Sequence, residues 1–232
     1  MNILILTGAG ISAESGVPTF RDANGLWEGH RFEDVATPQA FRRNPSLVHH
    51  FYNQRRRSLL DVRIQPNPAH RALAEFEAEH RGGFLLVTQN IDDLHVRAGS
   101  KNVLAMHGEL LKARCETTEE IFPWRDDLDE TTTNPNHPEF IGTMRPHVVW
   151  FGEMPLGLAR IEEAARNADL FIAIGTSAVV YPAAGIVRQT KPTCRKIEIN
   201  LDATPNSSEF DQSIRGKASI EVPAFLKSLA SG

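Results

Sequence analysis

The feature that most constrains the fold is a glycine-rich turn close to the N-terminus. The apolar run at residues 2–7 is typical of a short buried strand, and the turn follows it directly with Gly8, Ala9, Gly10 and Ala13. These residues match the Gly-x-Gly-x-x-Gly/Ala pattern of dinucleotide-binding loops. Such glycines allow the backbone to approach a pyrophosphate, whose charge is stabilised by the N-terminus of the next helix. The pattern predicts a dinucleotide site, with a glycine turn that binds no ligand as the alternative.

Short apolar runs recur along the chain, with helical patterns between several of them. The runs are at residues 84–88, 103–106, 170–174 and 196–199, and the helical patterns are at 67–79, 158–167 and 182–189. Alternating short buried strands and helices are typical of a parallel sheet covered on both faces. We therefore expect an α/β fold with a doubly wound, Rossmann-like parallel sheet.

Two stretches interrupt this alternation. Residues 38–62 have helical spacing where a second strand would be expected, and residues 116–140 are acidic and loop-like. We interpret both as insertions into a single domain that spans residues 1–232. The Rossmann-like core would comprise about residues 1–30, 66–112 and 146–232, and insertions at about 31–65 and 113–145 would form a smaller lobe.

The composition gives no indication of a nucleic-acid or membrane protein. The formal net charge of −4 provides no basis for non-specific binding to nucleic acid or anionic membranes, and no apolar run is long enough to span a bilayer. The two cysteines, Cys115 and Cys194, lie far apart, which argues against a disulfide framework or a cysteine-rich metal site. We expect a cytoplasmic protein and a monomer, although no sequence feature bears directly on oligomeric state.

The residues after the glycine turn argue against a dehydrogenase. Such an enzyme would have a second strand carrying an acidic residue about 20 residues further on, to bind the ribose. Here residues 17–27 are punctuated by proline and glycine and show no strand pattern. The sequence therefore favours dinucleotide binding without hydride transfer.

A series of motifs along the chain resembles the sirtuin family. They are Gly8-Ala9-Gly10-Ile11-Ser12, Gly16-Val17-Pro18-Thr19-Phe20-Arg21, Thr88-Gln89-Asn90-Ile91-Asp92, His107-Gly108, Val148-Val149-Trp150-Phe151-Gly152-Glu153, Gly175-Thr176-Ser177 and Asn200-Leu201. Each motif is modest alone, but together they follow the family order and cover nearly the whole chain. Among sirtuins, the sequence is most similar to the bacterial and mitochondrial type that accepts acidic acyl groups.

The resemblance implies an NAD-consuming deacylase of protein lysines. In this family the acyl-lysine carbonyl oxygen attacks the ribose carbon that bears nicotinamide, and an alkylimidate forms. A histidine then deprotonates a ribose hydroxyl, which attacks the alkylimidate, and water completes the reaction to give lysine and O-acyl-ADP-ribose. By position, His107 is the expected general base, because it follows the run at 103–106 and so lies at a strand end, where open α/β sheets place their sites.

The resemblance also implies which residues bind NAD. Asn90 is expected to act in catalysis by ordering water or substrate near the reacting ribose. Phe20 would shield that centre from water, Arg21 would meet a phosphate, and Asp92 would hold the nicotinamide carboxamide. The full expected set is Gly8, Ala9, Gly10, Ala13, Phe20, Arg21, Gln89, Asn90, Ile91, Asp92, Gly175, Thr176, Ser177, Asn200 and Ala218.

The chain departs from the family in its zinc module. Most sirtuins bind zinc through four cysteines arranged as two Cys-x-x-Cys-like pairs, and here only Cys115 occupies such a position. His137 has no visible partner ligands, and the acidic residues lack the spacing of a calcium loop. We expect no zinc and no other metal. The 116–140 excursion would be held by packing of Ile121, Phe122, Trp124, Phe140 and Ile141.

A helical stripe predicts an acyl pocket. At intervals of four, three, four and three residues the chain places Val48, Tyr52, Arg55, Leu59 and Val62 on one helix face. Arg55 is the charged member of this stripe, and a buried guanidinium normally requires an anionic partner. Its neighbours Arg56 and Arg57 fall off the stripe and are expected to be solvated.

The pair Tyr52-x-x-Arg55 is also similar to the pair that binds the acyl carboxylate in sirtuins preferring succinyl- or malonyl-lysine. The alternative is that Arg55 extends into solvent or pairs with a local acid. The resemblance further implies that an acyl-lysine peptide pairs as an added strand. The expected edge consists of Val149, Phe151, Gly152 and Glu153.

Two other functional classes remain open. One is a sirtuin-like enzyme that mainly hydrolyses NAD or transfers ADP-ribose, and the substrate edge together with Tyr52-x-x-Arg55 argues for acyl-lysine instead. The other is an NAD or ADP-ribose binding module whose catalysis has decayed. The joint presence of His107, Asn90 and Asp92 argues against decay.

Overall fold

The computed structural model describes residues 1–19, 27 and 29–230. Its largest element is a six-stranded sheet with the order β3-β2-β1-β7-β8-β9, in which neighbouring strands are parallel. The strands are β1 (Ile3–Thr7), β2 (Phe84–Thr88), β3 (Val103–Ala105), β7 (Leu170–Ile174), β8 (Arg195–Asn200) and β9 (Gln212–Arg215). In chain order this is the 3-2-1-4-5-6 arrangement of a doubly wound sheet, so the predicted fold class is confirmed.

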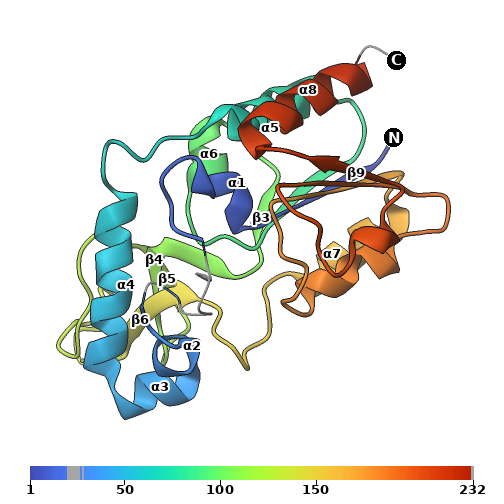
Figure 1. Cartoon of the computed structure of the whole chain (residues 1–232). Coiled ribbons are helices and arrows are strands. Elements are labelled where there is room, and N and C mark those ends of the chain that lie inside the picture. The colour runs from blue at the N-terminus through green and yellow to red at the C-terminus, as the bar shows by residue number, and fades with distance from the viewer. Residues whose placement is uncertain (20–26, 28, 231–232) are drawn as a thin grey trace.

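Helices cover both faces of this sheet (Figure 1). One face carries α1 (Ala9–Ala13), α5 (Pro68–Glu79), α6 (Leu94–Ala98) and α8 (Ala218–Ala230), and the other carries α7 (Leu158–Asn167) and the 3-10 helix η1 (Ala183–Gln189). In β1, Ile3 and Ile5 pack with α5 and α8, whereas Leu4 and Leu6 pack with α7 and η1. Side chains of a strand alternate between faces, so a continuous apolar run is what a strand between two helical layers requires.

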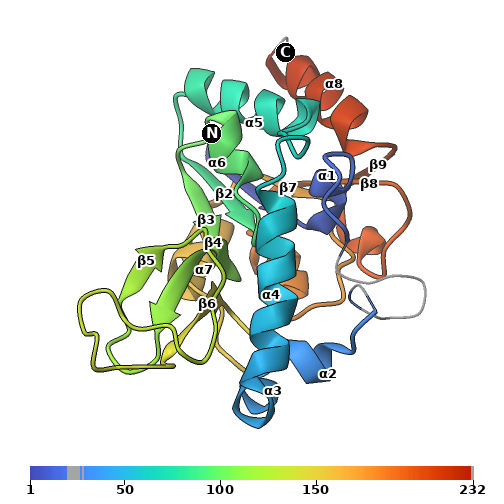
Figure 2. The same ribbon diagram turned by 90° about the vertical axis from the view of Figure 1, so that its left-hand side faces the viewer.

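A second, antiparallel sheet has the order β5-β4-β6. Its strands are β4 (Gly108–Cys115), β5 (Ile121–Pro123) and β6 (Met144–Val148), and beside it lie α2 (Phe32–Val35), α3 (Pro38–Arg43) and α4 (Pro45–Leu59). Figure 2 shows α4 standing next to this sheet, below the helices of the core. Phe51 of α4, Leu110 of β4 and Val148 of β6 share one apolar cluster. Helices α2, α3 and α4 therefore pack against the antiparallel sheet, and together they are called the small lobe below.

Within α4, the expectation that Arg56 is solvated is wrong. The residue is 0% exposed, and its guanidinium donates to the Leu110 carbonyl oxygen at 3.2 Å and to the Asn53 amide oxygen at 2.8 Å. Burial lowers the pKa of Arg56 to about 10. The prediction of one buried helix face is correct for Tyr52, which is buried. It is wrong for Val62, which lies beyond the end of α4 and is 83% exposed.

In the part of the chain that the structure describes, no helix has both the length and the apolar character needed to cross a membrane.

Candidate active site

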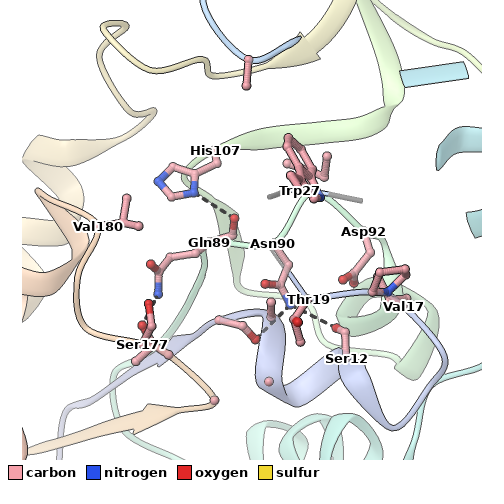
Figure 3. A pocket seen from close by; sticks show the side chains of 18 of the residues that line it. Ser12, Val17, Thr19, Trp27, Gln89, Asn90, Asp92, His107, Ser177 and Val180 are labelled. Carbon is pink, nitrogen blue, oxygen red and sulfur yellow. Dashed lines mark hydrogen bonds between the residues drawn. The ribbon is translucent and has the colours of Figure 1, made fainter. Parts of the chain in front are cut away.

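The ends of five core strands meet the small lobe at a cavity of about 640 Å³. Thr7 at the end of β1 is in register with Thr88 of β2 and Ile174 of β7, so the loops that follow these strands start side by side. The predicted residues that line the cavity are Gly8, Ala9, Gly10, Tyr52, Arg55, Gln89, Asn90, Ile91, Asp92, His107, Val149, Phe151, Gly152, Glu153, Gly175, Thr176, Ser177 and Asn200. Figure 3 shows several of them around the opening between β2 and α1.

Two of the predicted residues that the structure describes lie elsewhere. Ala13 is exposed at the end of α1, and Ala218 is buried at the start of α8 among the residues of the core. Neither lines the cavity, which is formed by the loops at the strand ends. Phe20 and Arg21 fall outside the described residues.

The glycine turn packs directly against the loop after β7. A Cβ atom at Gly8 would lie 2.7 Å from the Gly175 carbonyl oxygen, and one at Gly10 would lie 2.7 Å from the Gly175 Cα atom. Gly175 itself has a φ of +60°, and its own Cβ would lie 2.5 Å from the Ile11 nitrogen. Glycine at these positions is therefore required by backbone packing as well as by any ligand.

Hydrogen bonds tie the polar residues of three strand ends together. The Asn90 amide nitrogen donates to the Ser12 hydroxyl at 3.0 Å and to the Gly8 carbonyl at 3.2 Å. The Gln89 amide donates to the Thr176 hydroxyl at 2.9 Å, and the Asn200 amide donates to the Thr176 carbonyl at 2.7 Å. These contacts fix the predicted side chains around one opening.

The ring of His107 is held by a hydrogen bond to a backbone carbonyl group of the next strand end. Its Nδ1 atom lies 2.9 Å from the Gln89 carbonyl oxygen. Since a carbonyl oxygen only accepts, Nδ1 carries the hydrogen and Nε2 has a free lone pair. Burial lowers the pKa of His107, so the imidazole is neutral at neutral pH. The arrangement is that of a general base.

Asp92 lies on the other side of Asn90 (Figure 3). Burial raises the pKa of its carboxyl group, while hydrogen bonds from the Leu94 backbone and the Ser12 hydroxyl act in the opposite direction. The carboxyl group is thus oriented by two donors within a desolvated part of the cavity.

Sequence reasoning missed two buried histidines behind the glycine turn. His70 Nε2 lies 3.4 Å from the Ser12 hydroxyl, and His95 Nε2 lies 3.0 Å from the Thr7 hydroxyl. Their ring centroids are 4.8 Å apart. Burial lowers the pKa of His70 to about 4 and that of His95 well below its usual value. The one sequence signal was at His70. Asn67 followed by Pro68 is typical of a helix start, and His70, three residues after Asn67, is at the position of a capping residue.

Tyr52 and Arg55 lie one helical turn apart on α4 and line the same cavity as His107. The Tyr52 hydroxyl accepts a hydrogen bond from Trp150 Nε1 at 3.0 Å. The Arg55 guanidinium donates to the Phe51 carbonyl at 2.7 Å and lies over the Phe51 ring, with Trp27 at 5.3 Å. Aromatic faces and a hydrogen bond thus hold the cation at the cavity wall.

The segment between β6 and α7 passes along the cavity without forming a strand. The Val149 nitrogen donates to the His107 carbonyl at 2.8 Å, and the Phe151 nitrogen donates to the Ala36 carbonyl at 2.9 Å. Glu153 lies in the wall, and its carboxylate accepts from Arg145 at 2.7 Å and 2.9 Å, and from the Trp150 nitrogen at 2.8 Å. The Glu153 carboxylate therefore anchors this segment from within.

The 116–140 excursion is held mainly by polar contacts. The buried Asn134 amide donates to the Thr118 hydroxyl and to Glu120, both at 3.0 Å, and Cys115 Sγ lies 3.3 Å from the Thr143 hydroxyl. The expectation that Ile121 and Ile141 anchor the excursion is wrong, since they are 49% and 63% exposed. Phe122 and Trp124 do pack against its small apolar cluster. Among residues 1–19, 27 and 29–230, no group of three His, Cys, Asp or Glu side chains is placed to hold a metal ion.

The geometry defines a Rossmann-like fold with a neutral, partly buried histidine base at a cavity beside a glycine turn. Residues 8–182 match the model of the Sir2 family. An NAD-dependent protein deacylase of Rhodopirellula baltica is 69% identical, covering 97% of this chain and 98% of the relative, and the protein SIR2rp3 of Leishmania major is 56% identical, covering 97% and 93%. A crystal structure of a Sir2 homolog–NAD complex is 40% identical, with a TM-score of 0.89 over 99% of this chain and 90% of that one. The chain belongs to the Sir2, or sirtuin, family.

Proposed function

We propose that the chain is an NAD-dependent protein-lysine deacylase that accepts acidic acyl groups such as succinyl and malonyl as well as acetyl. The deacylase activity follows from membership of the Sir2 family and from relatives named NAD-dependent protein deacylase, which match over nearly the whole chain. The observation that carries the acidic-acyl part is the position of Tyr52 and Arg55, which line the same cavity as His107.

The strand ends fit NAD as the co-substrate. Gly8 and Gly10 expose their backbone to the cavity, and a pyrophosphate can approach it closely. Asn200 also lines the cavity, and its amide is fixed by a hydrogen bond to the Thr176 carbonyl. When bound, NAD supplies a ribose carbon from which nicotinamide leaves and a ribose hydroxyl that receives the acyl group.

His107 is the residue that moves a proton. The Gln89 carbonyl holds the imidazole in the tautomer whose Nε2 accepts, and burial keeps that nitrogen free of a proton at neutral pH. Nε2 would remove the proton of the ribose hydroxyl, and the imidazolium that results would be stabilised by the same carbonyl.

Asn90 would orient the water or hydroxyl that reacts. Its amide nitrogen is used by Gly8 and Ser12, so the side chain can offer only its carbonyl oxygen, an acceptor, to a further group. That leaves a fixed acceptor between the glycine turn and the His107 side of the cavity (Figure 3).

Arg55 gives the pocket its preference for negative charge. A guanidinium that lies over the Phe51 ring, with Trp27 nearby, is partly desolvated, so a carboxylate that reaches it gains a charge-assisted hydrogen bond. A succinyl or malonyl group ends in such a carboxylate, whereas an acetyl group does not. The Tyr52 hydroxyl lies in the same wall and can add a second contact.

The peptide would bind along residues 149–152, where the backbone borders the cavity. At Gly152, which has a φ of +90°, a Cβ atom would meet no heavy atom of the described chain within 4 Å, so this backbone is open to an incoming strand. We propose that Phe151 and Gly152 provide the pairing edge and that Glu153 supports it from behind.

The test is to incubate the protein with NAD and matched acetyl-, succinyl- and malonyl-lysine peptides. We expect equal amounts of nicotinamide, free-lysine peptide and O-acyl-ADP-ribose, with the acidic peptides turned over at least as efficiently as the acetyl peptide. Nicotinamide release without peptide would indicate an NAD glycohydrolase. NAD binding without any turnover would indicate a binding module.

A further inference from the structure

The indole of Trp150 occupies a fixed position behind the acyl pocket. Its ring is 2% exposed and lies under the Arg145 guanidinium, 3.3 Å from the ring centroid. Glu153 holds this guanidinium with two short hydrogen bonds and also accepts from the Trp150 backbone nitrogen. Trp150 is therefore held at two places: Glu153 binds its backbone nitrogen, and Arg145 packs on the face of its ring.

The indole N–H points at Tyr52. Trp150 Nε1 donates to the Tyr52 hydroxyl oxygen at 3.0 Å, and the two rings lie 6.4 Å apart at an angle of 37°. An indole nitrogen can only donate, so the tyrosine oxygen must accept in this contact. The hydroxyl hydrogen of Tyr52 is then directed elsewhere.

Among the residues that the structure describes, no neighbour in the pocket wall accepts that hydrogen. Arg55, the other polar side chain of the pair, carries only donors, and so does Trp150. In the described part of the chain, Tyr52 makes no hydrogen bond in which it is the donor. Tyr52 and Trp150 both line the cavity, so the free hydrogen of the hydroxyl is available to a ligand there.

We propose that Trp150 is a positioning residue for acyl selectivity, which commits the Tyr52 hydroxyl to donate toward a negatively charged acyl group. The inference rests on the proposed function, because it needs an acyl carboxylate as the acceptor. Trp150 does not touch this group and acts only through Tyr52. Without the indole N–H, the hydroxyl can rotate and its oxygen lone pairs can face the carboxylate, which would repel it.

The surroundings keep Tyr52 in the donor state. The residue is 1% exposed, and burial raises the pKa of its hydroxyl far above the usual range. The phenol therefore keeps its hydrogen at neutral pH. A pocket wall that presents the Tyr52 O–H next to the Arg55 cation offers donors from both residues, and it matches a carboxylate better than a carbonyl or an alkyl group.

The test is a double-mutant cycle of Trp150→Phe and Tyr52→Phe. For each variant, kcat and KM are measured on succinyl- and acetyl-lysine peptides of the same sequence, with NAD saturating. Trp150→Phe should lower the succinyl-to-acetyl ratio of kcat/KM by roughly 5-fold, mainly through KM for the succinyl peptide. In the Tyr52→Phe background, the same substitution should change the ratio by less than about twofold, because the hydroxyl it acts on is gone.

Two further variants separate positioning from packing. Trp124→Phe removes a buried indole N–H that has no hydrogen-bond partner in the described part of the chain, so it is the matched control and should leave the ratio unchanged. Benzothienylalanine at position 150 keeps the size of the indole and replaces only its N–H by sulfur. It should reproduce the ratio of Trp150→Phe with an unchanged melting temperature, even where Trp150→Phe itself is destabilised.

Independent effects of the two phenylalanine substitutions on the ratio would overturn the proposal, because Trp150 would then act by packing. An equal loss on both peptides in the benzothienylalanine variant would do the same. A wild-type protein that neither binds nor turns over the succinyl peptide would overturn the proposed acyl selectivity and this inference with it. Desuccinylation by the wild type without coupling would overturn this inference alone.

Discussion

His107 Nδ1 is hydrogen-bonded to the backbone carbonyl oxygen of Gln89, with 2.9 Å between the two atoms. Gln89, which follows strand β2, thus sets the tautomer of His107, which lies two positions after β3, although 18 positions separate the two residues. Because the acceptor is a main-chain oxygen, a substitution of the Gln89 side chain does not remove it. The base is oriented by the sheet itself.

His107→Ala should lower deacylation by about 10²- to 10⁴-fold, because a single acid–base group is commonly worth that much. NAD binding should persist, since the glycine turn and Asn200 are untouched. Steady-state turnover and calorimetric NAD binding measure the two effects. Near-normal turnover would show that another group removes the proton.

The pH profile should report the lowered pKa of His107. A base works when it is unprotonated, so kcat/KM should rise with pH through a midpoint below 6.5 and stay level from there to about pH 8. The measurement is kcat/KM from pH 5 to 9 on an acetyl peptide, which has no titrating acyl group. A rising limb centred at pH 7 or above contradicts the burial argument.

Arg55→Met should shift acyl selectivity. The methionine keeps much of the side-chain length but loses the charge, and charge-assisted hydrogen bonds are worth ~1.5–3 kcal/mol, so the succinyl-to-acetyl ratio of kcat/KM should fall by roughly 10-fold or more. Tyr52→Phe should lower the ratio less. Arg57→Met is the matched control, because Arg57 pairs with Asp127 on the exposed side of α4. Equal losses on both peptides would make Arg55 a structural residue.

Stability should fall between pH 6.5 and pH 4 partly because of His49. Both ring nitrogens of this buried residue lack a hydrogen-bond partner among the described residues, and burial lowers its pKa to about 4. In that pH range the unfolded chain binds a proton that the folded protein does not, so the free energy of unfolding decreases by up to roughly 3 kcal/mol as the pH falls.

His49→Leu should therefore flatten the pH dependence of unfolding and stabilise the protein more at pH 5 than at pH 8. Urea denaturation at the two pH values measures this difference. His50→Leu, at an exposed position of the same helix, is the matched control. If both variants showed the same slope as the wild type, the acid sensitivity would arise from other groups.

The 116–140 excursion should depend on Asn134 and not on zinc. Asn134→Ala removes the donor to Thr118 and Glu120 inside a buried network, which should cost ~1–3 kcal/mol of stability, whereas Asn136→Ala on the exposed side should cost less. Elemental analysis of purified protein should find no stoichiometric zinc, and chelators should leave turnover unchanged. One tightly bound zinc per chain would contradict this prediction.

The Rossmann-like core could be predicted because its strands are buried on both faces. In β1 and β7 every residue is buried and every residue is apolar or, at Thr7, hydrogen-bonded, so the apolar run and the strand coincide. His107 was singled out because it follows the apolar run at residues 103–106 and because the motif His107-Gly108 resembles that of the family. The 3-10 conformation of residues 183–189 could not be predicted, because its apolar spacing also suits an α-helix.

The small lobe could not be predicted in the same way. Strand β6 is buried along its whole length, yet its sequence Met144-Arg-Pro-His-Val148 contains an arginine, a proline and a histidine. Arg145 is tolerated there because Glu153, which follows the strand, neutralises it. When a buried charged residue depends on a partner elsewhere in the chain, the sequence of its strand shows no regular pattern of apolar residues that would predict the burial. The Trp150–Tyr52 contact, which spans 98 positions, was hidden for the same reason.

The contact of Gly8 and Gly10 with Gly175 has a consequence for how this sequence can drift. Three bare α-carbons, two from one end of the chain and one from more than 160 residues later, fill a space that admits no methyl group. An alanine at any one of them would separate the loops after β1 and β7, and no second substitution at the other positions could restore the fit, because no residue is smaller than glycine. A second substitution therefore cannot compensate for a first one at these three positions. The three positions can change only if the two loops part altogether.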